Sequence, residues 1–273
     1  MSITLLIIYL LLGLVVGFLS GLFGIGGGLV IIPILSYAFQ LLNFPSEIVM
    51  HMTIGTSLSI IFITVSSSTY HHYKKGGIDV DIYRKLFVFI AIGSLSGGFL
   101  SQYLSTSTLE LIFAVYVVLV TIKMFMDKTE HSRPRETSLI LYAVVGYIIG
   151  LKSAILGIGG GTVSIPFLSW RGVPMKKAVG ISAALGIPIA LFGASTYIYS
   201  GLKLTPEILP EYSLGYVYIP AFISVSILSS FASRLGAKAS HRLSQRQLKF
   251  IFALFLTLVL IKSVYSVAKF HLG

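Results

Sequence analysis

Apolar segments long enough to cross a lipid bilayer follow one another along almost the whole chain, and they constrain its fold more than any other feature. A helix crosses the hydrocarbon core with about 20 residues, each of which adds about 1.5 Å. Charged residues make up only 11% of the chain and the mean hydropathy is +0.92, whereas soluble domains carry roughly a quarter of their residues as charged. The sequence therefore predicts an all-α integral membrane protein, and its net charge of +11 does not indicate nucleic-acid binding.

Short polar or glycine-rich turns separate the expected helices. In the first half we expect helices at 3–23, 29–42, 47–73, 80–104 and 108–126. The most polar stretch, 127–137, is expected to link an N-terminal unit (1–126) to a C-terminal unit (138–273). The first apolar run has no basic residue before it and is longer than the core of a signal peptide, so we expect it to remain in the mature protein.

A glycine-rich motif occurs once in each unit. GIGGGLVIIPILSY at 24–37 returns as GIGGGTVSIPFLSW at 157–170, with ten of fourteen positions identical. A second pair of segments, 97–123 and 236–262, aligns without gaps in the same order. The chain is therefore predicted to contain two repeats, each a glycine-broken helical hairpin followed by three transmembrane helices. Hydropathy then predicts about eight long spans, or up to ten if the hairpin arms are counted separately.

The basic residues predict how the chain threads the membrane. Lys and Arg concentrate at 74–85, 123–135, 171–177 and 234–249, whereas the turns at 43–47, 104–108 and 201–213 hold one lysine between them. Because basic loops stay in the cytoplasm, the first group is expected inside and the second outside. Three crossings per unit invert the second repeat relative to the first. Both termini are then expected outside and the linker in the cytoplasm.

Inverted repeats with short, glycine-interrupted segments are typical of secondary transporters, whose substrate lies near the membrane midplane. The arms 29–42 and 162–170 would be about 21 and 14 Å long as helices, too short for a core of about 30 Å. Each arm would start a helix at the glycines, with Pro33 or Pro166 near its first turn as a structural residue. Free amides at such a start can bind an anion; the alternative is that the glycines only permit close helix packing. The predicted binding glycines are Gly24, Gly26, Gly27, Gly28, Gly157, Gly159, Gly160 and Gly161.

Polar side chains within apolar helices are further candidates for substrate binding. Thr56 and Ser57 in the first unit and Ser182 in the second could donate hydrogen bonds to an anion, or could instead bond their own or a neighbouring helix. Lys152 lies five residues before Gly157 in an apolar arm. A charge within the membrane indicates function, so we expect Lys152 to face an anionic substrate; the alternative is that its side chain extends to the membrane surface.

The placement of the acidic residues and histidines, and the absence of cysteine, limit the chemistry that the chain can carry out. All nine acidic residues fall in loops or at helix ends, and the chain has no cysteine. No carboxylate relay, metal site or cofactor is therefore expected. Because exporting a monovalent anion is downhill by about 2.3 kcal/mol per 100 mV, an uncoupled exporter is favoured. His51, His71 and His72 lie at expected helix ends and are interpreted as interfacial side chains.

Two other function classes are open. An anion channel would use the same glycine site, but its flux would not saturate or show counterflow. An intramembrane protease would need a nucleophile, and Gly193-Ala194-Ser195 resembles the corresponding segment of rhomboid-like proteases. No histidine follows it within an apolar helix, so the protein is not expected to be an enzyme.

The glycine motif at 24–28 with Pro33, its second copy ending at Pro166, and Gly-Thr-Ser-Leu at 55–58 resemble the TauE/SafE family of bacterial membrane permeases. The likeness covers essentially all 273 residues. It implies a transporter in the inner membrane of a bacterial cell that moves sulfur-containing anions such as sulfite, sulfonates or sulfoacetate, usually as an exporter. One departure is that Gly180-Ile181-Ser182 replaces the Gly-Thr-Ser of the first half, so the two halves differ chemically there.

Overall fold

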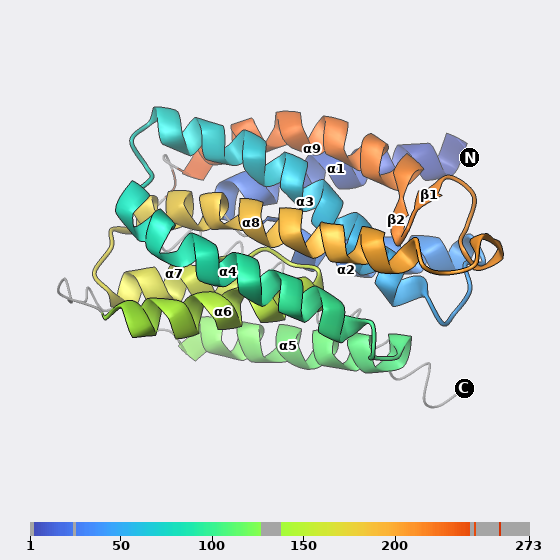
Figure 1. The fold of residues 1–273 in the computed structure, drawn as a ribbon. Helices are drawn as coiled ribbons and strands as arrows, with labels where there is room; N and C mark the ends of the chain where they lie inside the picture. The colour runs from blue at the N-terminus through green and yellow to red at the C-terminus, as the bar shows by residue number, and fades with distance from the viewer. Residues whose placement is uncertain (1–2, 24–25, 127–137, 241–242, 244–256, 258–273) are drawn as a thin grey trace.

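The protein is described here from a computed structural model, which covers residues 3–23, 26–126, 138–240, 243 and 257. The described residues form a bundle of helices that run side by side (Figure 1). In chain order the helices are α1 (Ile3–Phe23), α2 (Gly28–Leu41), α3 (Val49–Lys74), α4 (Val80–Ser101), α5 (Thr106–Met126), α6 (Leu139–Leu156), α7 (Gly161–Trp170), α8 (Met175–Gly201) and α9 (Ile219–Ser240). The prediction of an all-α membrane protein is confirmed.

Six of the described helices, α1, α3, α4, α6, α8 and α9, are long and apolar enough to cross a membrane. These are six of the eight predicted spans. The apolar part of α5 is described only over Thr106–Ile122, and the last predicted helix lies outside the described residues. With 14 and 10 residues, α2 and α7 are the expected short arms, because such helices are only about 21 and 15 Å long.

The segment 201–213 does not form the plain turn that was expected. It contains a 3-10 turn, Pro206–Ile208, and leads into a small hairpin of β1 (Ser213–Leu214) and β2 (Val217–Tyr218). The strands are antiparallel, and the turn between them passes through Gly215, whose φ is +55°. A strand pair this short gives almost no periodic signal in the sequence, which is why composition alone does not indicate it.

Helices α3 and α8 pack against each other at the centre of the bundle. In their apolar segments 83% and 78% of the residues are buried, against at most 50% in the other four spans. Both helices carry serine, threonine and glycine among their apolar residues. Such residues favour contact between helices over contact with lipid, because small side chains allow close approach and hydroxyls find partners.

The outer helices pair through stripes of glycine. In α1, Gly13 and Gly17 face α9, and a Cβ atom added to Gly17 would lie 2.2 Å from the carbonyl oxygen of Ser229. In α4, Gly93 and Gly97 face α6 in the same way, with the carbonyl oxygen of Leu151 2.2 Å from an added Cβ at Gly97. Glycines spaced four apart are the usual contact surface of membrane helices. These glycines, which lie outside the two glycine motifs, therefore serve the close packing of the helices.

The helix pairs relate the two units to each other. Helix α1 packs along α9, and α6 packs along α4; in addition α3 contacts α9, and α8 contacts α4 (Figure 1). We take α6, α8 and α9 as the repeat counterparts of α1, α3 and α4. The α1–α9 contact then corresponds to the α6–α4 contact, and the α3–α9 contact corresponds to the α8–α4 contact. A two-fold repeat produces this pattern. The inverted orientation of the repeats in a membrane stays a prediction.

We expect Gly17→Leu to destabilise the bundle, because the new side chain must push α9 away from α1. Lipid offers no hydrophobic drive to hold helices together, so close packing carries their association, and overpacking costs about 1–3 kcal/mol. Thermal unfolding in detergent should show a lower midpoint. Leu11→Ala, on a residue of the same helix that is 57% exposed, should leave the midpoint unchanged; an equal effect of both variants would contradict this account of the α1–α9 contact.

The polar connections sort to the two ends of the bundle. The α2–α3 and α4–α5 connections and the β-hairpin lie at one end, whereas the α3–α4 and α7–α8 connections lie at the other (Figure 1). The first set corresponds to the turns predicted outside and the second to the loops predicted in the cytoplasm. The chain therefore separates the two predicted sets of loops in space, and which end faces the cytoplasm stays a prediction.

Candidate anion-binding site

The two glycine motifs, 133 residues apart in the sequence, are in direct backbone contact. A Cβ atom added to Gly28 would lie 2.5 Å from the carbonyl oxygen of Gly157, and one added to Gly26 would lie 3.2 Å from Cα of Gly159. Backbones approach this closely only where glycine leaves out the side chain. The tertiary structure thus brings the two motifs together, whereas Gly24 lies outside the described residues.

Each motif ends in the start of a short helix. Helix α2 begins at Gly28 after Gly27, whose φ is +77°, and α7 begins at Gly161 after Gly160. Neither helix has a side-chain cap. The first amides of a helix have no partner within it, and together with the positive end of the helix dipole they attract anions. These two helix starts have the chemistry that the anion-site prediction requires.

Pro33 and Pro166 were expected near the first turn of their helices. In the structure they are the sixth residues of α2 and α7. Proline has no N–H, so it cannot bond the carbonyl four residues earlier. In α2 that carbonyl belongs to Leu29 and in α7 to Thr162. Both short helices therefore have a weakened second turn directly after the glycine motif.

The predicted hydroxyls take different places. The Ser57 hydroxyl donates to the Gly157 carbonyl at 2.8 Å, so Ser57 reaches the contact between the motifs. Thr56, one residue earlier, accepts a hydrogen bond of 3.0 Å from the backbone N–H of Tyr218. Thr56 therefore anchors β2 to α3, which is a structural role.

Ser182 lies in the second unit and joins α8 to α7. Its hydroxyl accepts a hydrogen bond of 2.9 Å from the hydroxyl of Ser164, and both side chains are buried. A Cβ atom added to Gly160 would lie 3.9 Å from the Ser164 hydroxyl oxygen. Ser182 is thus connected to the second glycine motif through Ser164.

Lys152 carries a positive charge to the start of α7. Its ammonium donates to the Tyr116 hydroxyl at 2.8 Å and to the Thr162 hydroxyl at 2.9 Å, and it lies 4.8 Å from the centroid of the Tyr116 ring. The Tyr116 and Thr162 hydroxyls are also hydrogen-bonded to each other. The side chain therefore ends between α5 and the start of α7.

No carboxylate within the described ranges pairs with the Lys152 ammonium, and the two hydroxyls to which it donates are neutral. An ammonium group away from water requires a compensating charge or several hydrogen-bond acceptors. Lys152, the two hydroxyls and the uncapped start of α7 together form a set of donors with a net positive charge. This set can bind a small anion.

Sequence reasoning missed Tyr116 and Thr162, although the repeat contains a signal for both. Aligning the two units pairs Thr162 with Leu29, and the second alignment pairs Tyr116 with Phe255. Lys152 likewise pairs with Leu19. All three polar members of the cluster are apolar in the other unit. The positive site is therefore formed once, by Tyr116 of the first unit with Lys152 and Thr162 of the second, whereas the glycine motif occurs in both units.

Comparison with known proteins assigns the chain to a family. The model of the family described as "Sulfite exporter TauE/SafE" matches residues 9–263. The chain belongs to the TauE/SafE family. A "Probable membrane transporter protein" of Haemophilus influenzae is 38% identical to this TauE/SafE chain over 94% of its length and 97% of the relative.

Two further relatives carry the same description. One from Methanocaldococcus jannaschii is 31% identical over 89% of the chain and 90% of the relative, and one from Bacillus subtilis is 22% identical over 95% and 97%. No solved structure matches the chain. This TauE/SafE protein is a multi-pass membrane transporter.

Proposed function

We propose that the protein exports a small sulfur-containing anion, such as sulfite, a sulfonate or sulfoacetate, across the inner membrane of a bacterial cell. The observation that carries the proposal is the Lys152 ammonium, hydrogen-bonded to two hydroxyls at the start of α7 with no described carboxylate beside it. An anionic oxygen would supply the missing negative charge. The family description, sulfite exporter, favours sulfur oxyanions within the anions.

The glycine contact supports alternating access around this site. Two short helices start where the two units touch, and their backbones approach without intervening side chains. A contact of this kind can slide or rock at little cost, because no interlocked side chains have to separate. We propose that the two units move about this contact and open the site to each side in turn, with both chain termini outside.

The positions of the acidic residues support export without a coupling ion. The described acidic residues lie in connections or at helix starts; Asp79 caps α4 by accepting from the amides of Asp81 and Ile82. No described carboxylate lies in the middle of a span to bind sodium or a proton. With the cell interior negative, a monovalent anion leaves downhill by about 2.3 kcal/mol per 100 mV.

Efflux from proteoliposomes tests the proposal. Vesicles containing the purified protein are loaded in turn with sulfite, sulfoacetate, an alkyl sulfonate and, as a control, chloride. We expect saturable efflux of at least one sulfur anion, stimulation by the same anion outside (counterflow), and no comparable chloride flux. Flux that does not saturate and lacks counterflow would indicate a channel, and absence of any sulfur-anion flux would overturn the substrate assignment.

Reporter fusions test the topology separately. A reporter active only in the cytoplasm should work when inserted in the linker 127–137 and should be inactive when fused before α1. The reason is that the connections at the linker end carry the excess of Lys and Arg. An extracellular linker would overturn both the proposed orientation and the inversion of the second repeat.

A further inference from the structure

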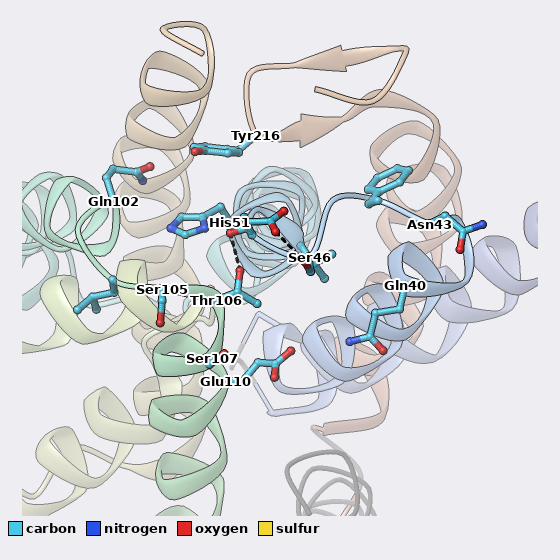
Figure 2. A pocket seen from close by; sticks show the side chains of 14 residues that line it. Gln40, Asn43, Ser46, His51, Gln102, Ser105, Thr106, Ser107, Glu110 and Tyr216 are labelled. Carbon is cyan, nitrogen blue, oxygen red and sulfur yellow. Dashed lines mark hydrogen bonds between the residues drawn. The ribbon is translucent and has the colours of Figure 1, made fainter. Parts of the chain in front are cut away.

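A second site lies at the end of the bundle that holds the β-hairpin. There a cavity of about 1060 Å³ opens between α2, the start of α3, the α4–α5 connection and the turn of the hairpin (Figure 2). Cavities of several hundred to about 1000 Å³ accommodate small molecules. We call this cavity the end pocket. It takes no part in the Lys152 cluster, since none of the three residues of that cluster lines it.

The charges in the end pocket are opposite in sign to those of the anion site. Glu47 and Glu110 line it, with the carboxamides of Gln40, Asn43 and Gln102, and no Lys or Arg of the described part of the chain does so. Glu47 is exposed, and hydrogen bonds from its own backbone N–H and from the Ser46 hydroxyl hold its pKa below the ordinary value. Glu47 is therefore ionised at neutral pH, and the pocket is negative.

A buried histidine adds an acceptor to the same wall. The Nε2 atom of His51 lies 3.1 Å from the carbonyl oxygen of Ser101, and because a carbonyl only accepts, Nε2 carries the proton. The Nδ1 atom is buried and makes no hydrogen bond of standard geometry among the described residues, although the backbone of Glu47 and of Leu104 lies next to the ring. His51 is 6% exposed, so its side chain packs within the protein near the start of α3.

The surroundings of His51 hold the ring in place. It stacks on Tyr216 with 5.2 Å between the ring centroids, and Figure 2 shows both rings on the wall that faces Ser105. Burial raises the pKa of the Tyr216 phenol, so this neighbour stays neutral. The titratable groups around His51 are therefore Glu47, Glu110 and neutral Tyr216, and they offer acceptors and negative charge.

We propose that the end pocket is the extracellular vestibule of the transport path, and that it attracts monovalent cations and ammonium groups and repels the exported anion. The proposal rests on the proposed export of an anion. Charged clefts change the local concentration of ions of either sign, with effects on association that reach about 10- to 1000-fold. A negative exit does not alter the final anion gradient. External anion that rebinds slows further efflux. A negative exit weakens this rebinding, so a higher external anion concentration is needed to inhibit efflux.

Right-side-out membrane vesicles loaded with sulfite test this inference. Efflux is measured while external sulfite is raised, which gives the external concentration for half-inhibition. In the double variant Glu47→Gln/Glu110→Gln we expect this concentration to fall about three- to tenfold at low ionic strength. The difference should shrink as salt is added, because about 1 M salt screens charges beyond about 3 Å. Dependence of efflux on internal sulfite should stay as in the wild type.

The matched control is Glu207→Gln/Glu211→Gln, which removes the same charge from the same end of the protein but from residues that do not line the pocket. Its half-inhibition should equal that of the wild type. Equal thermal midpoints of both double variants would show that they are folded, as the near-isosteric substitution of glutamine should ensure.

Three outcomes would overturn the inference. The external sulfite concentration for half-inhibition could be the same in Glu47→Gln/Glu110→Gln as in the wild type. It could also fall equally in the control variant. Either result would show that the pocket does not affect rebinding. The change could also appear for internal sulfite, which would place the pocket on the cytoplasmic side. In each case the wild type still exports sulfite, whereas a wild type without any sulfite efflux overturns the proposed function instead.

Discussion

Replacing Lys152 with glutamine is expected to lower anion efflux about ten- to a hundredfold. A hydrogen bond to a charged group contributes about 1.5–3 kcal/mol, and about 1.4 kcal/mol corresponds to a factor of ten in affinity. Glutamine can still bond the Tyr116 and Thr162 hydroxyls but brings no positive charge to the start of α7. Concentration-dependent efflux from proteoliposomes, normalised to folded protein, measures the loss.

Lys203→Gln is the matched control for charge and ring contact. The Lys203 ammonium also lies over a tyrosine ring, 4.3 Å from the centroid of Tyr199, but Lys203 is exposed on the connection after α8. This variant should transport normally. The unfolding midpoint of Lys152→Gln should be equal to or above that of the wild type, because an ammonium within the membrane is costly. Normal transport by Lys152→Gln, or an equal loss in both variants, would contradict the assignment of Lys152.

Gly28→Ala is expected to abolish transport and to destabilise the protein by about 2–4 kcal/mol. The added Cβ atom would lie 2.5 Å from the carbonyl oxygen of Gly157 and 2.6 Å from Cα of Ile158. Both atoms belong to the backbone, so no side-chain rotation relieves the clash and the two glycine motifs must separate. Thermal unfolding and efflux per folded molecule are the measurements.

Gly160→Ala provides a control within the second motif. There the nearest atoms to an added Cβ are the side-chain ends of Ile189 and Ile149, at 2.8 and 3.1 Å, and Gly160 has an ordinary φ of −69°. Because these side chains can shift, we expect a much smaller loss of stability than for Gly28→Ala. If both variants were equally stable, the backbone contact between the motifs would not be the constraint that we infer.

Hydropathy and the internal repeat predict much of this fold. The helix bounds expected for α1, α3 and α5 agree with the structure within about two residues. Such agreement is possible because a bilayer imposes one length and one type of backbone on every crossing segment. Glycine-rich breaks are also readable, since several glycines in succession favour a helix poorly and allow the positive φ found at Gly26, Gly27 and Gly157. The short hairpin and the buried state of His51 depend on contacts with distant elements and leave no comparable pattern.

The residues of the candidate site likewise fall into those that the sequence indicates and those that only the structure shows. The duplicated glycines and Lys152 stand out in the sequence, because one is a repeat and the other a charge in an apolar helix. Tyr116 and Thr162 do not, because a single hydroxyl in a helix is common and its meaning depends on what it touches. Ser57 and Thr56 are adjacent and chemically alike, yet one contacts Gly157 and the other holds β2.

The sequence by itself determined that this chain is a helical membrane protein with two related units and glycine-broken helices. These properties follow from local composition and from repetition along the chain. Only the tertiary structure decided that the two motifs touch, that Lys152 meets two hydroxyls from α5 and α7, and that a negatively charged pocket forms at the hairpin end. The physical reason is that these contacts join residues far apart in the chain, and helix packing alone sets which of them meet.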